Sequence, residues 1–153
     1  VNLGFSGNGK LEEPVVELLG ELDARLYIID GLGNMVGFAA DTIANRLIKA
    51  VRILRTKRPG VPIIIADDPH PAIRSLDLRV DSLYRRIDDI TEATFKKLRA
   101  SGIRSVYLLT SADIGLNSES TVEGLHPNDY GMILYADAYE KIIRRILQRT
   151  GGK

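Results

Sequence analysis

A glutamate and a histidine three residues apart are the clearest candidates for chemistry in this chain. Glu123 and His126 belong to the stretch Glu-Gly-Leu-His-Pro-Asn, just before the last helical pattern. A carboxylate at this spacing can turn back to the imidazole Nδ1, which holds the tautomer and leaves Nε2 as a general base. The spacing alone also fits a loop histidine near a surface glutamate. Gly124 and Pro127 stiffen the turn and favour the catalytic interpretation.

Two Gly-rich turns in the first quarter of the chain supply candidates for binding an oxyanion. Asn34 closes the turn Gly-Leu-Gly-Asn after an apolar run, where its side-chain amide can donate to a developing negative charge. Gly7 lies in Ser-Gly-Asn, where the missing side chain lets a substrate approach the backbone N–H. Taken singly, each residue is better explained as an ordinary turn residue.

The hydrophobic pattern predicts strands that alternate with helices along the whole chain. Four short apolar runs are typical of parallel strands buried on both faces: Val1–Leu3, Leu26–Ile29, Val61–Ala66 and Ile103–Leu109. Apolar residues at helical spacing mark four amphipathic segments, around 15–22, 43–54, 83–98 and 132–146. This order predicts a single α/β domain over residues 1–153, with three α/β/α layers around a parallel sheet.

Polar loops follow the predicted strands, and in such sheets ligands bind at the carboxyl ends of the strands. The loops are Gly4–Gly9, Asp30–Asn34, Asp67–Pro71 and Ser111–His126. We therefore expect Gly7, Asn34 and His126 to meet at one rim of the sheet.

Together these motifs resemble the SGNH hydrolase superfamily of GDSL-like lipases, acylhydrolases and esterases. Val1–Gly9 resembles its second conserved block, Gly31–Asn34 its third, and Glu123–Pro127 its fifth, which usually reads Asp-Gly-x-His-Pro. The resemblance covers essentially the whole chain. It implies a flavodoxin-like parallel sheet and serine-dependent hydrolysis of small acyl esters. In detail the chain is most similar to bacterial esterases that act on carbohydrates, often as deacetylases.

The resemblance also implies a role for each matching residue. The Gly7 N–H and the Asn34 amide form the oxyanion hole, His126 is the general base, and Glu123 orients it. Glu123 departs from the usual aspartate, although its longer arm can make the same bond. The family's reaction needs no metal or cofactor. His70, in Asp-Pro-His-Pro, is a weaker candidate for contacting the acyl group or the sugar, and the alternative is a rigid loop residue.

The family's first block, which carries the nucleophilic serine on a turn after the first strand, has no counterpart in this chain. It precedes the second block by on the order of 30 residues. In the family's fold its strand lies between the strands at Val1–Leu3 and Leu26–Ile29, so its loss would leave two rows of backbone groups unpaired. We therefore expect the functional protein to be longer, with an N-terminal segment or additional domain that supplies the strand and the serine. The chain alone is expected to be inactive.

Three alternatives stay open at this point. Ser6 lies in Gly-Phe-Ser-Gly-Asn, which approaches the nucleophile elbow G-x-S-x-G except that Asn8 replaces the second glycine. The stretch from Gly4 to Lys10 matches the phosphate loop G-x-x-x-x-G-K, but Leu11 replaces the Ser or Thr that binds magnesium. A non-catalytic binding domain on the same fold is the third alternative, because the serine is missing and Glu123 departs from the pattern.

The composition narrows the choice of partners. Apolar residues make up 44% and charged residues 27% of the 153 residues, as in an ordinary soluble domain. The net charge of +1 gives no reason to expect nucleic acid or an acidic membrane surface as a partner. The chain has no cysteine, which excludes disulfides and thiolate chemistry, and no apolar run approaches the roughly 18 residues of a membrane span. We expect a small ester or an acylated carbohydrate as substrate, and the compartment stays open.

Overall fold

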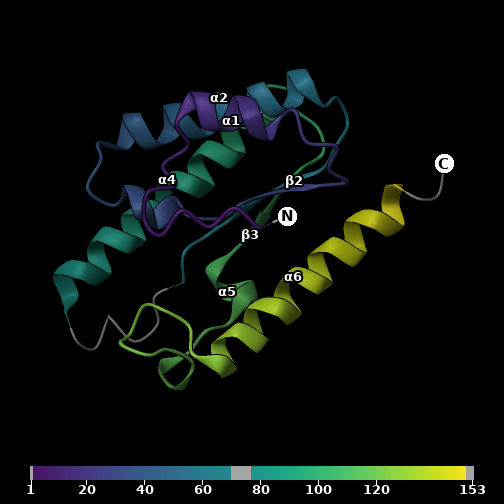
Figure 1. Cartoon of the computed structure of the whole chain (residues 1–153). Coiled ribbons are helices and arrows are strands. Elements are labelled where there is room, and N and C mark those ends of the chain that lie inside the picture. The colour runs from purple at the N-terminus through teal and green to yellow at the C-terminus, as the bar shows by residue number, and fades with distance from the viewer. Residues whose placement is uncertain (1, 70–76, 151–153) are drawn as a thin grey trace.

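Three parallel strands form the centre of the domain (Figure 1). The computed structural model describes residues 2–69 and 77–150. The strands are β1 (Tyr27–Ile29), β2 (Ile63–Ala66) and β3 (Val106–Leu109), in the order β1-β2-β3. Tyr27 pairs with Ile63, and Ile63 pairs with Val106. All four residues of β2 are buried, as expected for a central strand covered on both faces.

One face of the sheet is covered by α1 (Glu13–Leu19), α2 (Ala40–Lys57) and α4 (Leu78–Ala100). Ile43, Leu47 and Leu54 of α2 are fully buried at helical spacing and pack against Ile63 and Ile65. A residue at this spacing faces the sheet on every turn, which is why the amphipathic pattern predicts the helix correctly.

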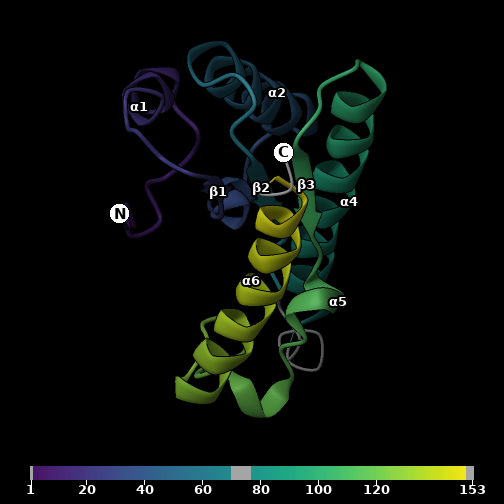
Figure 2. The same ribbon diagram turned by 90° about the vertical axis from the view of Figure 1, so that its right-hand side faces the viewer.

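The opposite face is covered by α5 (Ser111–Ile114) and α6 (Asp129–Thr150), which lies across the sheet from α2 (Figure 2). Ala138, Ile142 and Ile146 of α6 pack on Ile64 and on other residues of β2 and β3. The two apolar clusters on either side of the sheet confirm the predicted three-layer α/β/α arrangement. Met132, at the start of the predicted helical segment around 132–146, is 57% exposed and lies outside this core.

The prediction of a strand at Val1–Leu3 is not confirmed. Val1 lies outside the described residues, and residues 2–5 have no regular secondary structure, with the Leu3 and Phe5 side chains exposed. A strand needs a neighbour for its backbone groups, and no described strand lies beside this segment.

The edge of β1 that faces away from β2 pairs with no described strand, and Ile28 in its middle is 41% exposed. A groove of about 970 Å³ runs along this edge. Its walls come from the N-terminal segment 2–9, from α1, and from Tyr139 and Ile143 of α6, and we call it the β1 groove. None of the described helices is both long enough and apolar enough to cross a bilayer.

Candidate active site

The loop between η2 (Ser118–Ser120) and α6 carries the acid–base pair. The Glu123 carboxylate pairs with His126 Nδ1 and also accepts a hydrogen bond from the His126 backbone N–H (3.2 Å). The hydrogen bond from the His126 side chain is the main reason why the pKa of Glu123 is lowered, so the carboxyl is ionised at neutral pH. The His126 side chain is 81% exposed and therefore does not point into the core. A carboxylate on Nδ1 can hold the tautomer in which Nε2 carries the lone pair that a general base needs.

Asn128 and Gly131 hold this loop against the first turn of α6. The Asn128 N–H donates to the Ser120 carbonyl (3.0 Å), and its Oδ1 accepts from the Gly131 N–H (3.0 Å). A Cβ on Gly131 would lie 2.1 Å from the Ser120 carbonyl oxygen and 2.8 Å from Pro127 Cβ. Only glycine permits this approach, so the position of His126 depends on how closely α6 meets η2. In both views the loop before α6 lies at the same end of the molecule as α5 (Figures 1 and 2).

The two predicted oxyanion turns contact each other. Gly7 is in the left-handed region, with φ of 81°, and Asn34 lies on the short 3₁₀ helix η1 (Leu32–Met35), which directly follows Gly31. The Asn34 Nδ2 donates to the Gly9 carbonyl (3.2 Å), which brings the second turn against the first. An amide nitrogen carries two hydrogens, so one N–H of Asn34 remains for a substrate oxygen.

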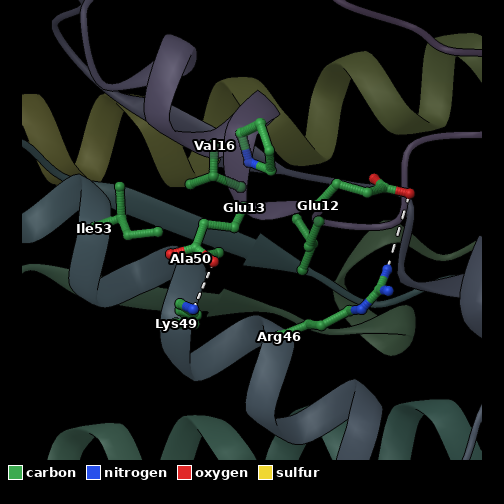
Figure 3. A pocket seen from close by; sticks show the side chains of 9 residues that line it. Glu12, Glu13, Val16, Arg46, Lys49, Ala50 and Ile53 are labelled. Atoms are coloured by element: carbon green, nitrogen blue, oxygen red, sulfur yellow. Dashed lines mark hydrogen bonds and ion pairs between the residues drawn. The ribbon is translucent and has the colours of Figure 1, made fainter.

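Arg46 of α2 braces both turns from the helix behind them. Its guanidinium donates to the Lys10 carbonyl (2.7 Å), just after the first turn, and lies 5.0 Å from the ring centre of Phe38, just after the second. Arg46 also forms an ion pair with Glu12 (3.8 Å) at the edge of a hollow of about 380 Å³ between α1 and α2 (Figure 3). Through these contacts Arg46 links the segment after the first turn to the segment after the second.

Asp68 and Tyr84 lie against the turn that carries Asn34, and sequence reasoning did not single them out. A Cβ on Gly33 would lie 1.5 Å from Asp68 Oδ2 and 3.2 Å from Tyr84 Cε1, so both side chains press on the turn that carries Asn34. Burial raises the pKa of Tyr84, and the negative charges of Asp68 and Glu123 raise it further. Tyr84 therefore lies against the turn that carries Asn34 and is close enough to Glu123 to feel its charge. No sequence motif marks these residues, because Asp68 follows β2 and Tyr84 lies on α4, both far from Gly33 along the chain.

A buried carboxyl lies beneath the rim, where β2 ends. Asp67 is 3% exposed, and its Oδ2 accepts from the Ser111 N–H (3.2 Å), while its Oδ1 has no hydrogen-bond partner among the described residues. The Ser111 hydroxyl donates to Asp88 (3.0 Å). Burial, followed by the charge of Asp88, raises the pKa of Asp67 to about 7. Ser111 is thus committed to two carboxyl groups, which argues against a role as nucleophile.

The structure groups the predicted residues in two pairs. Gly7 and Asn34 lie on touching turns, and Glu123 is bonded to His126. Among the described residues no hydrogen bond joins one pair to the other, so their convergence on one substrate stays a prediction. His70 lies outside the described residues. Within the described ranges, no group of three His, Asp or Glu side chains is placed to hold a metal ion.

The geometry also bears on two alternatives. A phosphate loop joins a strand directly to a helix, whereas here residues 2–5 form no strand and α1 begins at Glu13, beyond Lys10. Ser6 lies in an exposed turn without the preceding strand and following helix of a nucleophile elbow.

Comparison with known proteins settles the family. The profile of the GDSL-like lipase/acylhydrolase family matches residues 1–144. The chain belongs to this family. A GDSL-like lipase/acylhydrolase is expected to hydrolyse a carboxylic ester, which agrees with the exposed histidine and its carboxylate partner. Among curated proteins, none matches the chain significantly.

Two solved structures share the fold of this GDSL-like chain. One, from Bacteroides ovatus ATCC 8483, is grouped with the GDSL-like lipases and is 30% identical, with a TM-score of 0.86 over 97% of this chain. The other is the salicylyl-acyltransferase SsfX3 from a tetracycline biosynthetic pathway, 20% identical, with a TM-score of 0.73 over 94% of this chain. The chain spans only 43% and 42% of the lengths of these two proteins.

Proposed function

We propose that the protein hydrolyses small acyl esters by serine catalysis, with acetyl groups on carbohydrate as the substrate class. The serine attacks the ester carbonyl, and His126 takes its proton and then protonates the leaving alcohol. Glu123 holds the imidazole and stabilises its charged form. The Gly7 N–H and the Asn34 amide bind the oxyanion. The single observation that carries the proposal is the Glu123 carboxylate on His126 Nδ1, with the ring exposed to solvent.

The serine is proposed to come from a strand outside this chain that occupies the β1 groove. The unpaired edge of β1 forms the floor of the groove, and an added parallel strand would pair with it. Apolar side chains of α1 line the groove on one face of the sheet, and Tyr139 and Ile143 of α6 line it on the other. A strand between two helical layers is apolar on both faces, which suits these walls.

The position of the groove also supports this proposal. Asn8, Gly9, Asp30 and Gly31 line it near the carboxyl end of β1. A residue that follows an added parallel strand would therefore emerge beside both oxyanion turns. The single SGNH-like domain would then include this strand in addition to residues 1–153.

Activity-based labelling tests the proposal. The full polypeptide that carries this sequence and a serine-bearing strand is treated with a fluorophosphonate and assayed with p-nitrophenyl acetate and acetylated sugars. We expect labelling of one serine, loss of labelling in His126→Ala, and no labelling of the 153-residue chain alone. Labelling that survives in His126→Ala would contradict the assigned base. Sugar binding without labelling or turnover would instead favour a non-catalytic binding domain.

A further inference from the structure

One hydrogen bond crosses from α6 to the carboxyl end of β1. The Tyr139 hydroxyl donates to Asp30 Oδ2 at 2.6 Å, between residues 109 positions apart. We propose that this bond is a positioning contact of the catalytic centre, which sets the helix behind His126 in register with the turn that carries Asn34. The inference rests on the proposed esterase function.

The Asp30 end of the contact is joined directly to the oxyanion turn. Asp30 follows β1 and precedes Gly31, whose φ of 136° begins the turn. The Asn34 N–H donates to the Gly31 carbonyl (3.1 Å). A shift of the Asp30 backbone is therefore passed within one turn to the Asn34 amide.

The Tyr139 end is joined to the acid–base loop through a rigid helix. His126 lies three residues before α6, and Asn128 and Gly131 fasten the loop to its first turn. The apolar contacts of α6 are mainly with β2 and β3, the two strands that lie away from the β1 edge in the order β1-β2-β3. The Tyr139–Asp30 hydrogen bond adds a contact between α6 and the end of β1. It therefore links the helix next to His126 with the turn that carries Asn34.

The surroundings of Tyr139 stabilise its hydrogen bond to Asp30. The ring of Tyr139 stacks on Tyr135, with ring centres 6.1 Å apart and planes 22° apart, which limits its rotation. Burial raises the pKa of Tyr139, and the charge of Asp30 raises it further, so the phenol remains a donor at any working pH. Asp30 and Tyr139 both line the β1 groove, and a strand in the groove would shield their hydrogen bond from water.

The test compares Tyr139→Phe with Tyr135→Phe in the full polypeptide. Both variants remove one hydroxyl from α6 and keep the stacked rings, but no hydrogen bond of the Tyr135 hydroxyl occurs among the described residues. We expect Tyr139→Phe to lower kcat about tenfold with KM within about twofold, because small misplacements of catalytic groups cost this much or more. Tyr135→Phe should keep kcat within about twofold. Asp30→Asn retains an acceptor oxygen and should keep more activity than Asp30→Ala.

Two further measurements separate positioning from mere stability. The double variant Tyr139→Phe/Asp30→Ala should lose no more kcat than the worse single variant, because both remove one interaction. In ¹⁵N and ¹H NMR spectra, Tyr139→Phe should shift the signals of the Asn34 amide and of the loop 123–126 together. Unchanged kcat in Tyr139→Phe, even with a lower melting temperature, would overturn the proposal, as would additive losses.

The two proposals fail in different ways. A parent protein that neither hydrolyses esters nor reacts with a fluorophosphonate would remove the esterase function. The NMR comparison still decides the positioning contact in that case. Signals that shift only next to Tyr139 and Asp30 would refute it.

Discussion

Gly131→Ala offers a direct test of how the acid–base loop is held. The added Cβ would lie 2.1 Å from the Ser120 carbonyl oxygen, whereas a carbon and a carbonyl oxygen approach to about 3.3 Å. The contact is therefore too short by about 1.2 Å. Neither neighbour can rotate away, because the oxygen belongs to the backbone and the second contact, Pro127 Cβ at 2.8 Å, belongs to a ring.

The loop must then move away from α6 by about an ångström. His126 lies in the chain between Ser120 and Pro127, the two residues that the added Cβ would meet. A displacement of this size can lower a rate about 100-fold. Overpacking of this kind costs about 1–3 kcal/mol of unfolding free energy. In a domain of this length that corresponds to a melting temperature lower by roughly 2–12 °C.

The assay is the initial rate of the full polypeptide on p-nitrophenyl acetate together with a thermal melt. Gly37→Ala is the matched control, because a Cβ there meets no atom within 4 Å and its φ lies outside the left-handed region. We expect this control to keep its rate and to melt at the same temperature or slightly higher. A Gly131→Ala protein with kcat within about twofold of the parent would refute the argument that the loop is positioned by this contact.

Three other outcomes follow from the site. Asn34→Ala should lower kcat about 10²–10³-fold with little change in KM, and weaker binding with unchanged turnover would exclude Asn34 as an oxyanion donor. His126→Ala should lower kcat further than Asn34→Ala, and a milder loss would argue against a general base. Between about pH 4 and pH 7, Asp67 is protonated in the folded protein and ionised in the unfolded chain. The unfolding free energy should therefore fall by up to roughly 4 kcal/mol as pH rises through this range. Denaturant titrations at several pH values should show this fall in the parent and lose it in Asp67→Asn, and an equal slope in both would refute the raised pKa.

Local patterns made much of this protein predictable. The buried runs at β1, β2 and β3 and the helical spacing in α2 and α6 depend on neighbours along the chain, so the layered sheet follows from them. Glu123 and His126 are three residues apart, and their contact forms within one turn. Gly7 and Asn34 were identified because a turn glycine exposes its backbone N–H and a turn asparagine can donate its side-chain amide.

Contacts between distant residues decided the rest. The segment after Val1 forms no strand, because strand formation depends on a partner whose presence no local pattern encodes. Asp68 and Tyr84 contact Gly33 because folding brings the end of β2 and α4 against the turn after β1. Tyr139 reaches Asp30 because folding brings α6 against the end of β1. Propensity and periodicity act over a few residues, whereas these contacts span tens of residues and depend on how the helices pack. Local sequence therefore determined the elements and the two halves of the site, and tertiary packing decided which side chains join them.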